Sequence, residues 1–326
     1  MASTTGTHRR TVAHLSVGSF AMVMGIGGLS AAWNRAAAAW EAVPHAIGLG
    51  FAWLSFAALA TLIGAYAIKA MRHRRSVVAE WRHPVRGAFG ATIPIAFLIT
   101  AVALHDHASP VSRALWWIGA AAMFMVTIGI VRTWIRDAQI EPQHVHPAWF
   151  IPVVGNIVVP LAGVTYAPAA ISWYFYGVGL VYWLGLLPMV LRRLFVEGTM
   201  PARLMPTLAI LVAPPAVAAI SWVKLGGSWD DPLARTLLAA ALFQLVVLVT
   251  LTPDLRKVPF ALPSWAYTFP LAAAAVAFIA AYDSGEGTFY AWAGSIVLAI
   301  ATTLVLVFGV LTARGFASGT LLQPEG

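Results

Sequence analysis

Residues 148–164 read AWFIPVVGNIVVPLAGV, a stretch without a single charged side chain. A helix that crosses the hydrocarbon core of a bilayer needs about 20 mostly apolar residues, with roughly 17 to 25 as the working range. The stretch also contains Pro152, Pro160, Gly155 and Asn156, residue types that interrupt a regular helix or place a polar amide inside it. The segment therefore predicts a membrane-spanning helix with a broken backbone.

Nine further stretches of comparable length occupy most of the chain, and none of them contains Asp, Glu, Lys or Arg. In chain order the ten runs are 16–33, 46–68, 87–104, 114–131, 148–164, 169–191, 204–223, 236–252, 258–282 and 288–311. We therefore predict an all-α integral membrane protein in which residues 1–326 form a single domain of ten transmembrane helices.

The composition agrees with this class. Of the 326 residues 60% are apolar and only 10% are charged, whereas an average soluble domain is about 25% charged. The formal net charge is +8, but the basic residues lie in short runs between apolar stretches. A nucleic-acid binder would gather them on one soluble face among aromatic residues, so that class is excluded. The absence of cysteine excludes a disulfide scaffold and a thiolate metal site.

The basic residues also predict the orientation. Of the 20 Lys and Arg residues, 16 fall on one side of the ten expected spans and 4 on the other, whereas the 12 acidic residues divide evenly. Cytoplasmic loops collect positive charge, and acidic residues contribute little to orientation. We therefore expect both termini in the cytoplasm and the chain in the inner membrane of a bacterial-type cell. The longest internal loop is expected at 69–86.

Proline separates odd-numbered from even-numbered spans. Seven prolines that fall in odd spans are Pro94, Pro152, Pro160, Pro206, Pro214, Pro215 and Pro270, whereas the even spans contain Pro188 alone. Backbone groups freed by proline are tolerated at membrane depth only where protein or a water-filled cavity covers them. We expect five helical hairpins whose odd members line a path and whose even members face lipid. In the alternative interpretation, Pro and Gly only kink packed helices.

The midpoint of each odd span marks the expected bilayer midplane. The residues there are Gly25, Pro94, Asn156, Pro214 with Pro215, and Phe269. They predict a narrow and nearly uncharged ring. Asn156 could contact an ion in this ring, and the alternative is that its amide makes a buried hydrogen bond between helices.

We expect no enzymatic activity, because the spans lack the ionisable side chains from which a catalytic site would be built. The ten runs contain no Asp, Glu or His for a proton relay. His105 with His107, and His144 with His146, form two H-x-H pairs that could hold a metal. No carboxylate or thiolate set converges on them in the sequence. We therefore expect no metal, no cofactor and no nucleic-acid partner.

Several segments resemble one known family. They are GSFAMVMGIGG at 18–28, HPVR at 83–86, PAWFIPVVGNIVVP at 147–160, VAPPAV at 212–217 and WAYTFP at 265–270. Together they resemble the tellurite-resistance TehA family, which includes plant slow anion channels and fungal malate-type transporters. The resemblance implies five hairpins in a quasi-five-fold ring, a central pore between the odd helices and a homotrimer of independent pores. It also implies that a phenylalanine of the ninth span plugs the pore. That residue is Phe269, with Phe260 as the rival assignment.

These observations favour a gated anion channel that passes small inorganic anions such as nitrate and chloride. The weak electric field of a pore without charged side chains cannot replace the water that an anion loses. Nitrate, which is dehydrated more easily than chloride, is therefore expected to pass better. The alternative function is a secondary carrier that exports a dicarboxylate, sulfite or tellurite oxyanion. The expected partners are small anions, the lipid bilayer and further copies of the chain.

Overall fold

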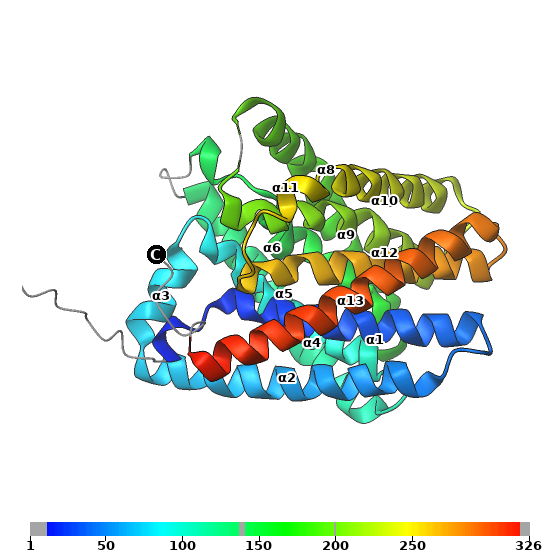
Figure 1. The fold of residues 1–326 in the computed structure, drawn as a ribbon, viewed down its shortest axis with the longest axis horizontal. Coiled ribbons are helices and arrows are strands. Elements are labelled where there is room, and N and C mark those ends of the chain that lie inside the picture. The colour runs from blue at the N-terminus through cyan, green and yellow to red at the C-terminus, as the bar shows by residue number, and fades with distance from the viewer. Residues whose placement is uncertain (1–11, 137–140, 199, 320–326) are drawn as a thin grey trace, which may run out of the picture.

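A computed structural model describes residues 12–136, 141–198 and 200–319 of the chain, and the regular elements in these ranges are all helices. The long helices run side by side along one axis of the molecule (Figure 1). Nine helical segments among the described residues are long and apolar enough to cross a membrane. The expected span 16–33 coincides with η2 (Val17–Phe20) and the start of α1 (Ala21–Ala39), which is not among the nine. The count of ten therefore stays a prediction.

Five long helices form the outside of the bundle. They are α2 (His45–Arg72), α5 (Ser109–Arg136), α8 (Ala169–Val196), α10 (Pro232–Thr250) and α13 (Thr288–Ser318). Each is an uninterrupted α-helix, and only 22 to 39% of its most apolar segment is buried in the chain. Most of them extend beyond the apolar runs into segments that contain Lys or Arg.

Five broken helices fill the inside, and each begins as a 3₁₀ helix and ends as an α-helix. They are η2 to α1, η3 (Arg86–Ala91) to α4 (Thr92–Leu104), η5 (Pro147–Trp149) through α6 (Phe150–Val154) and η6 (Gly155–Val158) to α7 (Pro160–Tyr166), η7 (Ala202–Val212) to α9 (Ala213–Lys224), and η8 (Leu262–Tyr267) to α12 (Thr268–Asp283). In the four that qualify as spans, 72 to 83% of the apolar segment is buried. Runs of 3₁₀ helix longer than three or four residues are uncommon, yet η7 has 11.

Small residues allow the inner helices to approach closely. A Cβ added to Gly25 of α1 would lie 2.7 Å from Cβ of Thr268 on α12. A Cβ on Gly27 would lie 2.8 Å from Oγ of Ser55 on α2 and 2.9 Å from Cγ2 of Ile99 on α4. Contacts this close are available only to glycine, as at other small-residue interfaces between membrane helices. Helix α1 therefore packs tightly between an outer helix and two inner ones.

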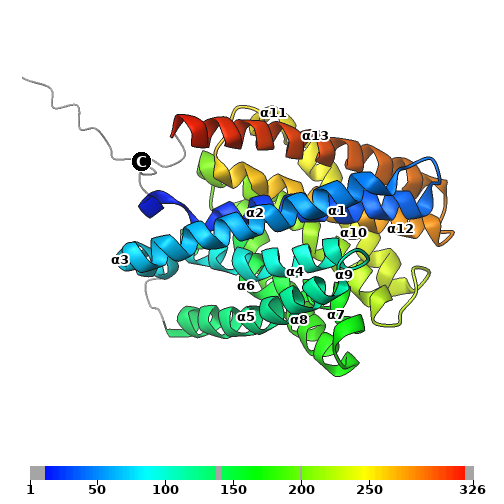
Figure 2. The same ribbon diagram turned by 90° about the horizontal axis from the view of Figure 1, so that it is seen from below.

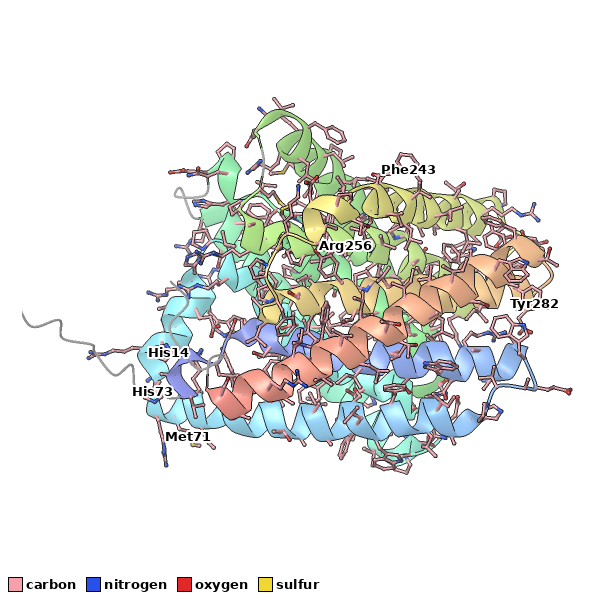
Figure 3. All side chains as sticks on the ribbon, in the orientation of Figure 1. His14, Met71, His73, Phe243, Arg256 and Tyr282 are labelled. Atoms are coloured by element: carbon pink, nitrogen blue, oxygen red, sulfur yellow. The ribbon has the colours of Figure 1, made fainter. Side chains whose placement is uncertain are left out.

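The two ends of the bundle differ in charge. Figure 3 places His14, Met71 and His73 at one end and Tyr282 at the other. We call the former the basic end, because Arg72, Arg74, Arg75, Arg82 and Arg86 follow each other there in the sequence. The chain termini lie outside the described residues. The nearest described elements, η1 (Val12–His14) and the C-terminal end of α13, both lie at the basic end (Figure 2).

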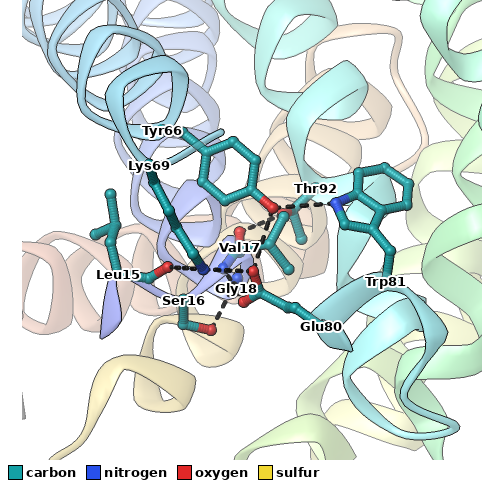
Figure 4. Close-up of polar contacts among 9 residues, drawn as sticks. All are labelled: Leu15, Ser16, Val17, Gly18, Tyr66, Lys69, Glu80, Trp81 and Thr92. Carbon is teal, nitrogen blue, oxygen red and sulfur yellow. Dashed lines mark hydrogen bonds and ion pairs between the residues drawn. The ribbon is translucent and has the colours of Figure 1, made fainter. Parts of the chain in front are cut away.

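The remaining short helices include α3 (Arg74–Arg82), η4 (Pro142–His144) and α11 (Thr252–Leu255). The segment 69–86, expected only as a loop, contains α3 and the final turn of α2. A buried ion pair joins them, because Lys69 Nζ lies 2.7 Å from Glu80 Oε2 (Figure 4). Lys69 also donates to the Leu15 carbonyl, and Glu80 accepts the Val17 N–H, both at 2.7 Å. The start of the first inner helix is therefore fastened to α2 and α3.

Candidate functional site

A small cavity of about 70 Å³ lies at the centre of the inner helices. Almost all of its lining is apolar, and all five inner helices contribute to it. Ala21, Thr92, Val158, Ala213 and Phe269 line it, and each lies where its helix changes from 3₁₀ to α winding. The interruptions in the five helices therefore meet around a single point.

A wider cavity of about 520 Å³, the basic vestibule, opens at the basic end. Its polar lining includes Ser16, His83, Arg86 and Arg203. Three of its apolar lining residues, Ala21, Phe89 and Ala266, also line the central cavity. The two cavities are therefore neighbours along the inner helices.

A third cavity of about 480 Å³, the far vestibule, lies beyond the centre toward the other end. Its lining includes Asn34, Arg35, Asp106 and Lys224, and it shares Phe269 with the central cavity. Arg35 forms an ion pair with Asp283 at the end of α12. The three cavities thus follow one another along the bundle, wide at both ends and narrow in the middle.

Phe269 occupies the boundary between the central cavity and the far vestibule. It is the second residue of α12 and is 9% exposed. Its ring lies against Gly28 of α1, where an added Cβ would be 3.1 Å from Cδ2 of the ring. The rival, Phe260, precedes η8 and packs on Phe308 of α13 with ring centroids 5.4 Å apart. Phe260 does not line the central cavity, so the geometry favours Phe269.

The other residues expected in the ring lie in different surroundings. Pro214 lines the central cavity together with Phe269, whereas Gly25, Pro94, Asn156 and Pro215 are buried without lining it. Asn156 Nδ2 donates to Thr127 Oγ1 at 2.9 Å and to the Val153 carbonyl at 2.7 Å. The bond to Thr127 of α5 is a helix-to-helix contact of the kind given by the alternative interpretation, whereas the bond to Val153 stays within the inner helix. Asn156 therefore joins an inner helix to α5.

Two arginines of the basic vestibule were not expected as site residues. Arg86 begins η3 and Arg203 is the second residue of η7, so both stand at the entrance of an inner helix. His83 Nδ1 accepts the N–H groups of Val85 at 3.1 Å and Arg86 at 3.2 Å. Burial and then the charge of Arg86 lower the pKa of His83, with a further contribution from His144. Because Nδ1 accepts, the proton of the neutral His83 ring lies on Nε2.

The two H-x-H pairs have other contacts. His105 Nδ1 lies 2.9 Å from the Tyr166 hydroxyl. His146 is buried and stacks on Phe89 with ring centroids 6.2 Å apart, and burial lowers its pKa to about 4. Within the described residues, neither pair belongs to a group of three side chains that could hold a metal.

Comparison with known proteins places this geometry in context. A family model described as a voltage-dependent anion channel, SLAC1, matches residues 14–313. The S-type anion channels SLAH2 and SLAH3 of Arabidopsis thaliana are each 28% identical to the chain, over 94% and 91% of its length. The chain spans 60% and 47% of those two proteins. A tellurite resistance protein TehA homolog of Haemophilus influenzae is 26% identical over 80% of the chain and 79% of its own length.

Proposed function

The chain belongs to the SLAC1 family of voltage-dependent anion channels, and from this premise we propose that it is a gated channel for passive transport of small inorganic anions. The path runs from the basic vestibule through the central cavity to the far vestibule. In this proposal, ten transmembrane helices form five hairpins in a quasi-five-fold ring, and three copies assemble as a homotrimer of independent pores. The basic end faces the cytoplasm of a bacterial-type cell, across the inner membrane.

The observation that carries the proposal is the narrowing at Phe269. Two cavities of about 520 and 480 Å³ are separated by one of about 70 Å³. An apolar constriction blocks ions both by its width and by excluding the water that they need. Phe269 borders the narrow cavity and the far vestibule, and it therefore acts as the gate of a closed channel.

The lining also supports selectivity for weakly hydrated anions. The central cavity has no charged side chain among its lining residues. An ion there must give up much of its hydration, and nitrate gives up water more readily than chloride. The arginines of the basic vestibule raise the local anion concentration before that step. We therefore expect the permeability to nitrate to exceed the permeability to chloride.

Replacement of the ring tests the gate. Phe269→Ala, reconstituted in planar bilayers, is expected to conduct anions far above the wild-type level, and Phe269→Leu to an intermediate level. Phe260→Ala is the matched control, because the same ring is removed from the same stretch outside the central cavity. Conductance well above the turnover of a carrier supports a channel, whereas proton-linked flux without current supports the carrier alternative. A folded Phe269→Ala protein with unchanged current would remove Phe269 from the mechanism.

A further inference from the structure

We propose that the basic vestibule is a binding site for divalent inorganic oxyanions, such as sulfate or hydrogen phosphate. An ion bound there blocks the path from the basic end. This inference rests on the proposed function for its effect on current. The binding itself does not depend on conduction and is measured separately.

The two arginines of the vestibule have no acidic partner among the described residues. In the described part of the chain, no ion pair or side-chain hydrogen bond joins the guanidinium of Arg86 or Arg203 to another residue. The described carboxylates of the basic end have other partners. These are Lys69 for Glu80, Arg192 and Arg193 for Glu197, Lys257 for Asp254, and Gln143 for Glu141. Two positive charges therefore face one cavity without compensation.

The backbone that carries both arginines is held in place by hydrogen bonds. The turn before Arg86 is closed by His83 Nδ1, which accepts two N–H groups of the chain. A Cβ on Gly87 would lie 2.6 Å from the Trp81 carbonyl oxygen, so the next residue packs tightly against α3. Arg203 lies within a turn in which the Pro201 carbonyl accepts the Leu204 N–H at 2.8 Å. Because the backbone at both arginines is already ordered, less conformational entropy is lost when the two long side chains bind one ligand.

The side chains that line the vestibule match the chemistry of an oxyanion. A guanidinium presents a planar fork of N–H donors that matches two oxygens of an oxyanion. Two such forks supply two positive charges, which complement a divalent ion. His83 adds a neutral Nε2–H donor to the same lining, and Ser16 adds a hydroxyl. No carboxylate lines the vestibule to repel the ion.

An ion bound in the vestibule blocks the path because the next part of the path does not admit it. Beyond Ala21, Phe89 and Ala266, the path narrows from about 520 to about 70 Å³ and loses its charged lining. A divalent oxyanion holds its water tightly, and moving it into an apolar space costs far more than moving a monovalent ion. The vestibule admits the divalent ion and the central cavity rejects it. The ion therefore stays where a permeant anion has to enter.

Binding is measured first, on the purified full chain in detergent. Equilibrium binding of radiolabelled sulfate is compared for the wild type, Arg86→Gln, Arg203→Gln and Arg75→Gln. The control Arg75→Gln removes the same charge from exposed α3 at the same end, outside the vestibule. We expect the dissociation constant for sulfate to be at least tenfold larger in each vestibule variant and unchanged in the control. A parallel series with phosphate shows whether the site separates the two oxyanions. Equal binding by all four proteins would overturn the site.

Block is then measured on the nitrate current of reconstituted channels. Sulfate added to the solution that faces the basic end is expected to reduce the current, and Arg86→Gln and Arg203→Gln are expected to relieve that reduction. Addition at the far end is expected to have no such effect. Arginine-dependent sulfate binding without any current in any variant would refute the channel and leave the site intact. A current that sulfate at the basic end does not reduce would refute the block.

Discussion

The inner and outer helices are built from equally apolar sequence but fold differently. The mean hydropathy of the qualifying segments overlaps, from 1.5 to 2.0 inside and from 1.6 to 2.6 outside. Nevertheless 72 to 83% of an inner segment is buried, against 22 to 39% of an outer one. The outer helices are regular and continuous, and the inner helices change their winding at the central cavity. Hydropathy thus identifies a span, whereas proline within the apolar run occurs in four of the five inner helices and in one of the outer helices.

The largest expected difference in stability between a buried and an exposed position concerns two adjacent tryptophans of α5. Trp116 is fully buried and its Nε1 donates to the Val159 carbonyl of an inner helix at 2.9 Å, whereas Trp117 is 42% exposed. Trp116→Ala is expected to lower the free energy of unfolding by about 3 to 5 kcal/mol. Trp117→Ala is expected to change it by less than about 0.5 kcal/mol. Denaturant unfolding in one detergent measures both, and equal losses would mean that both faces of α5 pack alike.

A smaller difference in stability is expected between two glycines, one in an inner helix and one in an outer helix. Gly25 of α1 faces Thr268 of α12 so closely that a methyl group overlaps it, whereas a methyl group on Gly64 of α2 has nothing within 4 Å. Gly25→Ala is expected to cost about 1 to 3 kcal/mol by overpacking. Gly64→Ala is expected to gain up to about 1 kcal/mol from helix propensity. Thermal unfolding of the two variants gives shifts of opposite sign, and two stabilising shifts would contradict the close contact.

A smaller effect comes from pH at the start of an inner helix. Burial is the largest cause that lowers the pKa of His146, to about 4, and His144 and Arg193 lower it further, while the Val85 backbone acts in the opposite direction. The unfolded chain takes up this proton near pH 6.5, so stability is lost as the pH falls from about 6.5 toward 4. The expected loss between pH 7 and pH 5 is about 2 kcal/mol. The His146→Gln variant should lack this part of the pH dependence, and an unchanged slope would contradict it.

Sequence patterns predicted much of the fold, because apolar length and proline position are local properties. The segment 148–164 was expected to be broken, and it consists of four short helical pieces between Pro147 and Tyr166. The 3₁₀ winding itself was not predicted. Hydropathy does not distinguish a hydrogen bond to the third preceding residue from one to the fourth, and a run of 11 such residues in η7 is unusual. Helix α3 was also missed, because it is too short and polar to appear as a span.

The candidate site was predicted only in part, for a geometric reason. The midpoint of a span gives the depth of a residue but not the direction in which its side chain points. Phe269 and Pro214 face the central cavity, whereas Asn156 turns toward Thr127 of an outer helix. Arg203 was counted only as a charge that sets orientation, and Arg86 was counted in the same way and as part of the HPVR segment, so neither was expected in the site. The available signal was their position, because each stands within one residue of the start of an odd apolar run.

The mixed winding of the inner helices has a mechanical consequence. A 3₁₀ helix rises about 2.0 Å per residue and turns 120° per residue, against about 1.5 Å and 100° in an α-helix. Five residues of η7 that rewound from 3₁₀ to α would therefore shorten the helix by about 2.5 Å and rotate everything beyond by about 100°. Such a change would move the helix along its axis and rotate it about that axis. Helix η7 is followed by Ala213 at the narrowest part of the path, where a rotation of about 100° would exchange one set of lining side chains for another.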